Sequence, residues 1–332
     1  MVCTPSPIEP VPGPGALGVD PDAGLPVGFR IVTDPDTQML QPGVLFGGSP
    51  ARILRVNGPG TAALAALAGG PVRSDVEAAV ARRLTDANLA QPLPPEDHER
   101  QAVTVVIPVR DRPQQLDRCL ASLGGEHPVL VVDDGSAVAE ETAVVCRRHG
   151  ACLLRHETSR GPGSARNTGL AVVTTPLVAF VDSDCVPRPD WINGLVGHLA
   201  DPLVACVAGR MVPLPAPAPT PIGLMARYAQ SRLPLDLGPR PAAVAPGRRV
   251  AYVPSANLVA RRAALGAGFD ETLRYGEDVD LIWRLVEAGW RVRYEPAVEV
   301  PHEEPPSGWR LLRRRFEYGT SAGPLSVLHP GS

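Results

Sequence analysis

One segment, Val178-Ala179-Phe180-Val181-Asp182-Ser183-Asp184, joins an apolar run to two carboxylates that lie one residue apart. Side chains alternate along an extended strand, so Asp182 and Asp184 can face the same way at its carboxyl end. Open α/β sheets bind their ligands at this end of their strands. The segment therefore predicts a buried strand that brings two acids to a ligand site.

The residues around this strand predict the other parts of a sheet. Strands are expected over Val103–Ile107, Val129–Val132, Cys152–Leu154, Leu177–Val181 and Val204–Ala208, and helices over Gln114–Leu123, Ala139–His149 and Ser164–Val172. Strands and helices that alternate in this way form a mainly parallel sheet with right-handed crossovers. We therefore expect an α/β domain over residues 102–322, with a mainly parallel sheet and flanking helices.

The last third of this domain predicts further elements. A Pro-rich stretch, Pro213–Pro246, is too long for a simple connection and is a candidate lid or substrate loop. Beyond it we expect strands over Val250–Val253, Arg291–Tyr294 and Ala297–Val300, one helix that begins at Glu277 and another that begins at Ser307. Residues 323–332 are expected to form a tail.

A different pattern precedes the domain. Residues 1–25 are rich in Pro and Gly and predict a flexible lead-in, and residues 91–101 predict a linker. Residues 26–90 predict short strands followed by two helices, the second over Asp75–Ala90 behind a capping box of Ser74 and Glu77. Because this small α+β module has few of the groups that catalysis uses, we interpret it as a binding or docking element.

The composition excludes several classes of protein. With 44% hydrophobic residues and a net charge of −3, the chain has an ordinary globular composition. It contains no lysine, which Schiff-base enzymes and P-loop ATPases need at a fixed place. Its arginines are scattered among nearly equal numbers of acids, so we expect no nucleic-acid partner.

Cysteine spacing and hydropathy indicate where the protein works. The six cysteines form no Cys-x-x-Cys pair, and the N-terminus lacks the basic and apolar regions of a signal peptide. No apolar run approaches the roughly 18 residues that a membrane span needs. We therefore expect a cytoplasmic protein whose contact with the inner membrane is at most peripheral, through Arg313–Arg315 and Phe316.

Two further segments place polar groups at the ligand edge of the sheet. Pro108-Val109-Arg110-Asp111 ends the first strand, and Asp133-Asp134-Gly135-Ser136 ends the second. A carboxylate there can accept a hydrogen bond from the imide N–H of a uracil, and the turn that follows can approach a ribose closely. The alternative is that Asp-Gly-Ser is simply a turn and a helix cap.

A Gly-rich segment, Arg160–Asn167, comes just before a predicted helix. Its backbone amides and Arg166 can hold a diphosphate. The alternative is an ordinary helix start with a surface arginine. The residues that we expect to bind such a phosphorylated donor are Pro108, Arg110, Asp133, Asp134, Arg166, Asp182, Ser183 and Asp184.

The Asp182-Ser183-Asp184 motif also suits a divalent cation. Mg²⁺ and Mn²⁺ prefer oxygen ligands, and either ion would neutralise a departing nucleoside diphosphate. His302 follows a predicted strand and could complete the site with Asp184. A lone histidine is more often structural than a ligand, but if His302 coordinates, its nitrogen favours manganese.

Glu277 and Asp278 begin a helix that also contains Trp283 and Arg284. Acids at a helix N-terminus are commonly there for the helix dipole alone. The functional alternative makes one of them the base that takes a proton from an acceptor hydroxyl, with Glu277, Trp283 and Arg284 on the acceptor side. The dipole would keep such a carboxylate ionised, so the base would depend on its position more than on a raised pKa.

These motifs occur in a fixed order along residues 102–320. They are Val106-Ile107-Pro108, Val132–Ser136, Gly163–Asn167, Asp182-Ser183-Asp184, Gly276–Arg284, and Glu295-Pro296 leading to His302. In this order and spacing the chain resembles the family 2 glycosyltransferases of the GT-A fold. The resemblance implies an inverting transferase that uses a metal-bound nucleotide-diphosphate sugar.

The same resemblance implies roles for single residues. Asp133 or Asp134 would contact the nucleobase, and Asp182 and Asp184 would lie near the ribose and the metal. Asp278 would be the catalytic base, and His302 a metal ligand.

The whole chain, including Gly43–Pro50 and the helix behind Ser74, further resembles the glycosyltransferases of the mycofactocin system. Its front module is similar to small peptide-recognition domains. The resemblance implies transfer of glucose from a uridine-diphosphate sugar to a small peptide-derived redox cofactor or its carrier. Members of this group continue beyond the point where this chain stops, which predicts that the tail is truncated.

Two other functions fit parts of the pattern. Asp182-Ser183-Asp184-Cys185-Val186 matches the Asp-x-Asp-x-Val signature of haloacid-dehalogenase phosphatases, but these enzymes need a lysine and the chain has none. A peptide-binding scaffold with a non-catalytic nucleotide-binding domain is the second alternative. The presence of every expected carboxylate argues against it.

Overall fold

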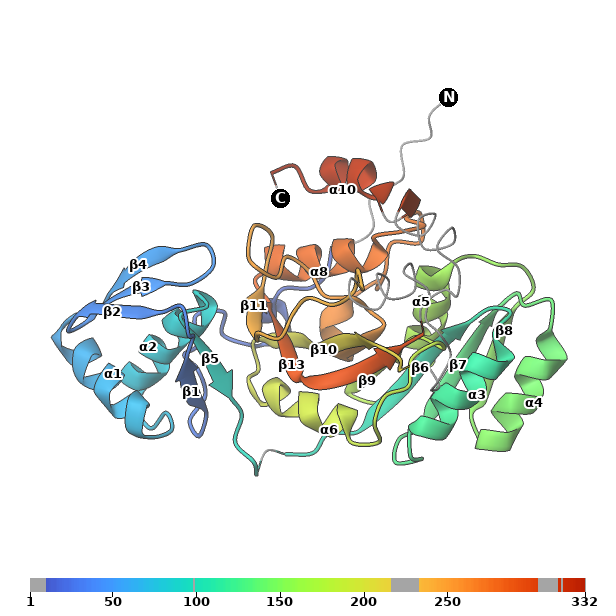
Figure 1. The fold of residues 1–332 in the computed structure, drawn as a ribbon, viewed down its shortest axis with the longest axis horizontal. Coiled ribbons are helices and arrows are strands. Elements are labelled where there is room, and N and C mark those ends of the chain that lie inside the picture. Colours follow the sequence, from blue (N-terminus) through green and yellow to red (C-terminus); the bar gives the residue numbers. More distant parts are fainter. Residues whose placement is uncertain (1–9, 98, 216–232, 304–315, 318, 332) are drawn as a thin grey trace.

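The computed structural model describes residues 10–97, 99–215, 233–303, 316–317 and 319–331. Figure 1 shows a small unit built from the front of the chain beside a larger unit that holds the long sheet. The small unit contains helices α1 and α2, a three-stranded sheet in the order β2-β3-β4 and a two-stranded sheet of β1 and β5. Its elements are β1 (Arg30–Thr33), β2 (Gln38–Gln41), β3 (Val44–Gly47), β4 (Arg52–Arg55), α1 (Gly58–Gly69), α2 (Asp75–Asp86) and β5 (Ala90–Leu93).

Helix α2 begins where the sequence predicts and ends earlier. The Ser74 hydroxyl accepts from the Glu77 N–H at 3.4 Å, which caps the first turn. The helix predicted over Asp75–Ala90 ends at Asp86, because Asn88 has a left-handed φ of 57° and turns the chain. The chain then continues as β5, which pairs antiparallel with β1 over residues predicted as a linker.

Residues 10–25 differ from the predicted flexible lead-in. They contain the short 3₁₀ helix η1 (Pro14–Leu17), and Val11 and Leu25 are buried. The indole of Trp290 donates to the Pro12 carbonyl at 2.7 Å. Prolines favour extended backbone without N–H donors, and here that backbone packs along the larger unit instead of remaining mobile.

The larger unit is built on an eight-stranded sheet in the order β11-β13-β10-β12-β9-β6-β7-β8. Its strands are β6 (Val103–Val109), β7 (Val129–Asp134), β8 (Cys152–His156), β9 (Leu177–Val181), β10 (Val204–Pro213), β11 (Ala242–Val244), β12 (Asn257–Arg261) and β13 (Arg291–His302). Parallel pairs join β6 to β7 and β9, β7 to β8, and β10 to β13. Strand β12 runs antiparallel to β9 and β10, and β11 runs antiparallel to β13. The predicted mainly parallel sheet is confirmed.

Helices cover both faces of this sheet (Figure 1). They are α3 (Pro113–Ser122), α4 (Ala139–His149), α5 (Pro162–Val172), α6 (Trp191–Val196) and α8 (Glu277–Glu287), and α10 (Ala322–Leu328) lies near α8. Alternation along β9 divides the core. Phe180 packs with residues of α5 and α8, and its ring meets Phe269 edge-on at 5.3 Å, whereas Val181 packs with α3 and α6.

Two predictions for the last third need correction. The strand expected over Val250–Val253 is absent from the described structure, where the Ala251 carbonyl accepts from the indole of Trp283 on α8 at 2.9 Å instead of from a neighbouring strand. The two strands expected within 291–300 are one strand, β13, with an irregular register against β10. Within the predicted lid, β11 is described, whereas residues 216–232 lie outside the described residues, as does the start of the helix expected from Ser307.

A buried ion pair joins the two units. The Arg82 guanidinium donates to both carboxylate oxygens of Asp201 at 2.6 and 2.8 Å, and the two side chains are 9% and 3% exposed. Asn88 adds a reciprocal pair, because its amide donates to the Ala243 carbonyl and accepts from the Ala243 N–H. Paired charges and matched amides at a buried contact indicate that the front module is docked in one orientation.

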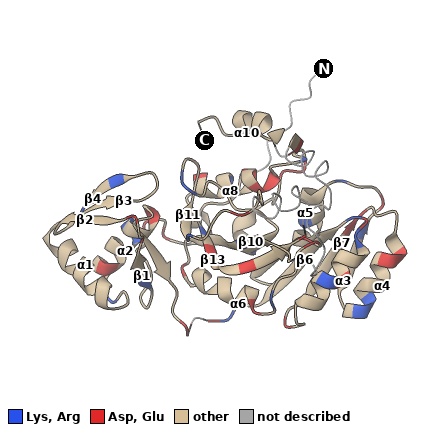
Figure 2. Ribbon diagram, in the orientation of Figure 1, with Lys and Arg blue, Asp and Glu red and all other residues tan. Residues whose placement is uncertain are grey.

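Charged residues are interspersed over the ribbon of both units, as Figure 2 shows. Within the part of the chain that the structure describes, no helix combines the length and the apolar character that crossing a bilayer requires. The cytoplasmic location and the peripheral membrane contact stay predictions.

Candidate active site

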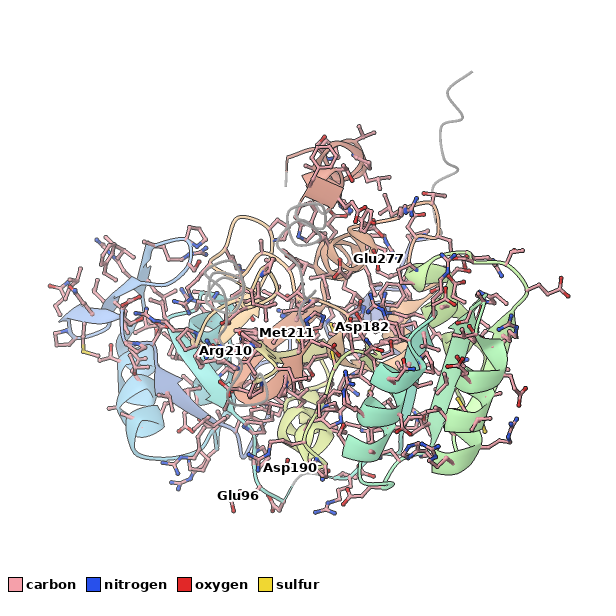
Figure 3. The ribbon with its side chains drawn as sticks, turned by 45° about the vertical axis from the view of Figure 1, so that its right-hand side comes forward. Glu96, Asp182, Asp190, Arg210, Met211 and Glu277 are labelled. Atoms are coloured by element: carbon pink, nitrogen blue, oxygen red, sulfur yellow. The ribbon has the colours of Figure 1, made fainter. Side chains whose placement is uncertain are left out.

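A cavity of about 1250 Å³ opens where β6, β7 and β9 end and α8 begins. A pocket for one small ligand usually has a volume of roughly 300–1000 Å³, so this one has room for a donor and an acceptor together. Figure 3 shows Asp182 and Glu277 on neighbouring elements in this region. The predicted site residues that line the cavity are Pro108, Arg110, Asp134, Arg166, Asp182, Ser183, Asp184, Glu277, Asp278 and Trp283. Asp133, Arg284 and His302 do not line it.

The two acids at the end of β7 have different tasks. Asp134 faces the cavity and accepts from the backbone N–H groups of Arg160 and Gly161 at 2.8 and 2.9 Å and from the Ser159 hydroxyl at 2.7 Å. Burial by itself would raise the pKa of Asp134, but these bonds and one from His156 lower it below its ordinary value. Asp134 therefore fixes the loop before α5 as one wall of the cavity.

Asp133 fits the alternative in which Asp-Gly-Ser is simply a turn and a helix cap. It is fully buried, accepts from the Ser136 N–H at 2.9 Å and pairs with Arg155. These contacts make it the anchor of the Asp-Gly-Ser turn, and they hold it away from the cavity. The predicted contact with a nucleobase is therefore not open to Asp133, and for Asp134 it stays a prediction.

Arg166 is placed differently from the prediction. Its side chain is 4% exposed, and it donates to Asp182 Oδ1 at 2.6 Å and to Glu277 Oε1 at 3.0 Å. Its guanidinium also lies 5.4 Å from the centre of the Phe269 ring. A side chain buried between two carboxylates is poorly placed to reach a diphosphate. The backbone at the start of α5, which also lines the cavity, remains suited to that anion.

The predicted metal ligands are neighbours. His302 Nε2 lies 3.4 Å from Asp184 Oδ1, and backbone bonds from Val186 N–H to the Pro301 carbonyl and from Glu303 N–H to the Asp184 carbonyl hold the two segments together. Mg²⁺ and Mn²⁺ commonly take one or two protein ligands and complete their shell with phosphate oxygens and water. Among the described residues no cluster of three or more His, Cys, Asp and Glu side chains could hold a metal by itself. The donor set therefore fits an ion that arrives with a phosphorylated substrate.

Glu277 and Asp278 form an unusual acidic pair at the start of α8. Burial raises the pKa of Glu277 to about 7, with a further contribution from Asp278 that Arg166 partly offsets. Burial likewise raises the pKa of Asp278, and the Asp182 carboxylate adds to the effect while Arg166 opposes it. The expectation that the helix dipole would dominate is wrong, because desolvation outweighs it. A carboxylate with a raised pKa is a stronger base near neutral pH.

The end of the cavity predicted to take the acceptor is lined by Trp283 and by residues that the sequence did not indicate. Trp283, Tyr252, Tyr275 and Leu325 line this end of the cavity. Burial and the charge of Asp278 raise the pKa of Tyr252. Arg284 is also predicted at this end of the cavity but does not line it. It donates to Asp280 and to the Gly268 carbonyl, and so holds α8 in place.

Arg112 is a further site residue that sequence reasoning missed. It lines the cavity and forms an ion pair with Asp184. A signal was present, since Arg112 lies two residues beyond Arg110 in the segment that ends the first strand of the sheet. Tyr252 and Leu325 carry no such signal, because only the fold brings their segments to the cavity.

Comparison with known families agrees with this geometry. A sequence model described as glycosyl transferase family 2 matches residues 104–233, and one described as glycosyl transferase family group 2 matches residues 177–322. An uncharacterised glycosyltransferase of Mycobacterium tuberculosis is 34% identical over 198 residues, which cover 58% of this chain and 82% of that protein. The chain belongs to glycosyl transferase family 2.

Another relative matches almost the whole chain. The pre-mycofactocin glycosyltransferase of M. tuberculosis is 46% identical over 314 residues, which cover 92% of this chain. The chain spans 65% of the length of that relative. The similarity extends through the front module, as the resemblance read from the sequence predicts.

A solved structure shares the fold of this family 2 chain. It is a mannosyltransferase from Pyrobaculum calidifontis in complex with GDP-Man and Mn²⁺, with a TM-score of 0.50 and 22% identity over 68% of this chain and 63% of that one. The GT-A fold is thereby confirmed. The haloacid-dehalogenase alternative is wrong, because the Asp182-Ser183-Asp184 motif belongs to a family 2 glycosyltransferase domain.

Proposed function

We propose that this protein is a metal-dependent inverting glycosyltransferase that moves glucose from UDP-glucose to an acceptor hydroxyl in the glycosylation of mycofactocin. The observation that carries the proposal is one cavity that joins the Asp182-Ser183-Asp184 motif to the acidic pair Glu277 and Asp278. The relative named pre-mycofactocin glycosyltransferase supports the choice of pathway.

The donor half of the cavity is polar. Asp134, with Pro108 and Arg110 beside it, would hold the wall of the cavity that faces the nucleobase and the ribose, and the start of α5 would face the diphosphate. Asp184 and His302 would hold Mg²⁺ or Mn²⁺, with Asp182 and Ser183 close by. Such an ion would neutralise the charge that develops on the departing diphosphate.

Asp278 would act as the base in transfer. Its carboxylate takes the proton of the acceptor hydroxyl while that oxygen forms a bond to the anomeric carbon of the sugar. The bond from this carbon to the diphosphate breaks, and the electron pair leaves with the nucleoside diphosphate. Attack opposite to the leaving group inverts the configuration, and the burial that raises the pKa of Asp278 favours this proton transfer near neutral pH.

The acceptor half suits a small compound with apolar or aromatic parts. Trp283 is fixed by its bond to the Ala251 carbonyl, and Tyr252, Tyr275 and Leu325 complete this end of the cavity. Aromatic side chains provide large contact areas with polar edges. This character fits a peptide-derived acceptor better than a highly charged polymer.

The front module would bind the peptide-derived acceptor or its carrier. Strand β2 forms one edge of its sheet, and all four of its residues are exposed. Phe46 and Ile53 are cross-strand neighbours on β3 and β4 and are 40% and 55% exposed. An edge strand beside exposed apolar side chains can pair with an extended peptide.

Product analysis tests the proposed reaction. The protein would be incubated with Mn²⁺, UDP-glucose and small peptide-derived acceptors, and the products would be separated and weighed by mass spectrometry. The expected product gains one or more hexose units, and NMR shows that its anomeric configuration is opposite to that of the donor. Retention of configuration would contradict the inverting mechanism, and donor binding without any transfer would favour the scaffold alternative.

A further inference from the structure

Arg166 links opposite walls of the cavity. It lies on α5, and its two terminal nitrogens donate to Asp182, just beyond β9, and to Glu277, the first residue of α8. The side chains of Asp182 and Glu277 are 31% and 10% exposed. The guanidinium therefore connects the donor-side acids to the acceptor-side acids through two charge-assisted hydrogen bonds.

The surroundings of Arg166 restrict it to this arrangement. The Phe269 ring lies 5.4 Å from the guanidinium, and Gly163, on the same helix as Arg166, lies beside the Glu277 side chain. A planar guanidinium can make two directed bonds at once, which a lysine ammonium matches less well. Packing thus fixes the distance between the end of β9 and the start of α8.

The charge balance at this point also depends on Arg166. The charged groups that face Glu277 are Arg166 from α5, Asp182 from the loop after β9 and Asp278 from its own helix. Arg166 is the cation among them, and it opposes the effect of burial on the pKa values of both Glu277 and Asp278. Its loss would leave buried carboxylates uncompensated.

We propose that Arg166 is a positioning residue that ties the base-bearing start of α8 to the donor-binding acid Asp182, so that the base and the donor sugar are held at a fixed separation. This inference rests on the proposed function. It replaces the diphosphate contact that the sequence predicts for this arginine. Misplacement of reacting groups by about 1 Å can lower a rate by about 10²-fold, which is the scale of effect expected here.

The coupling between Arg166 and Glu277 can be tested without any substrate. Urea unfolding would be measured for wild type, Arg166→Gln, Glu277→Gln and the double variant. Arg166→Gln should destabilise the protein less when Glu277→Gln has already removed the carboxylate, so the two effects should not add. Additive changes in the free energy of unfolding would contradict a coupling between Arg166 and Glu277. If Arg166→Gln does not fold, Arg166→Lys replaces it in the same cycle.

A matched control comes from Arg82, which is also a buried arginine paired with a carboxylate. Arg82 bonds Asp201 between the two units, away from the cavity. Arg82→Gln combined with Glu277→Gln should be additive, because the two sites share no partner. Non-additivity of this control would show that the cycle reports a general loss of stability, and would overturn the inference drawn from it.

Kinetics test the positioning role. Arg166→Lys should lower kcat by about 10²-fold while KM for the donor and the affinity for UDP with Mn²⁺ stay within about threefold of wild type. Arg166→Gln should also move the acid limb of the kcat profile to higher pH, because the carboxylates lose their cation. A loss of UDP affinity equal to the loss of kcat/KM would show that Arg166 binds the donor, and would overturn the proposal.

Failure of the inference and failure of the proposed function give different results. If wild type transfers no sugar while the unfolding cycle is non-additive, the coupling of Arg166 to Glu277 is supported and the proposed transferase function is contradicted. If wild type transfers sugar while the cycle is additive and the pH profile of Arg166→Gln is unchanged, the transferase function is supported and the positioning role of Arg166 is contradicted.

Discussion

His302 Nε2 lies 3.4 Å from Asp184 Oδ1, although β13 and the segment after β9 are far apart in the sequence. Their side chains are 1% and 6% exposed, so the pair is buried; Asp184 lines the cavity and His302 does not. An imidazole nitrogen and a carboxylate oxygen this close can share one divalent ion, with diphosphate oxygens completing its shell. The proposed metal site therefore depends on a contact that only the folded sheet creates.

Replacement of either ligand should weaken metal-dependent donor binding. Asp184→Ala and His302→Ala should each lower the affinity for UDP in the presence of Mn²⁺ by at least about 10-fold, measured by calorimetry. His198→Gln is a matched control, because His198 is also buried and faces Glu295 at 3.2 Å, outside the cavity. Unchanged Mn²⁺ dependence in His302→Ala would exclude His302 as a ligand.

Asp278→Asn should abolish transfer and leave the donor site intact. Loss of a general base typically costs about 10²–10⁴-fold in rate, so kcat should fall by that range while UDP affinity stays close to wild type. Asp280→Asn makes the same change two residues later, at a buried position that does not line the cavity. If Asp278→Asn turned over at the normal rate, the base assignment would be wrong.

The free energy of unfolding should fall as the pH rises toward the raised pKa of Glu277. Burial raises the pKa of Glu277 from 4.5 to about 7, so between these values the folded protein binds more protons than the unfolded chain. The contribution of Glu277 is therefore fully present below about pH 4.5 and is lost on the way to pH 7, on the order of 1–3 kcal/mol. Glu277→Gln should flatten this part of the curve in urea unfolding measured at several pH values. An equally steep curve in the variant would place the titration elsewhere.

The buried pair between the two units should matter for stability and not for chemistry. Asp201→Asn leaves the Arg82 charge uncompensated and should cost about 3–5 kcal/mol in the free energy of unfolding. Arg188 and Asp190 form an exposed pair, so Asp190→Asn should cost less than about 1 kcal/mol. Equal effects of the two variants would show that the unit interface is not held by this contact.

The front module should contribute to acceptor capture alone. Phe46→Ser and Ile53→Ser shorten exposed apolar side chains without touching the cavity. We expect weaker binding of a peptide-derived acceptor or its carrier by fluorescence anisotropy, with UDP affinity unchanged. Val327→Ser removes another exposed apolar side chain, on α10, and should leave acceptor binding as it is. A parallel loss in all three variants would indicate non-specific binding.

The strands and the carboxylates that follow them could be predicted because their signals are local. All residues of β9 are buried, and their side chains alternate between the two faces of the sheet, with Phe180 on one face and Val181 on the other. The Asp-Gly-Ser turn and the capped start of α2 depend on a few neighbouring residues. The sequence suggested a pairing of Asp184 with His302 only through the predicted strand before His302 and through the family resemblance.

Other features depend on contacts that no local pattern contains. The left-handed backbone of Asn88 ends α2, and its amide pairs with the Ala243 backbone across the interface between the two units, a contact that the sequence does not show. The raised pKa of Glu277 arises from burial beneath several elements, and a sequence shows only its place at a helix start. Arg166 looked like a phosphate ligand because the sequence does not show that Asp182 and Glu277 enclose it.

Calorimetric titration of wild type with UDP and with GDP, each with Mn²⁺ and with EDTA, tests the central claim of a metal-dependent uridine-diphosphate-sugar site. The account predicts that UDP binds in the presence of Mn²⁺, that EDTA abolishes this binding and that GDP binds at least about 10-fold more weakly. Equal binding of UDP and GDP, or binding of UDP that EDTA leaves unchanged, would contradict it.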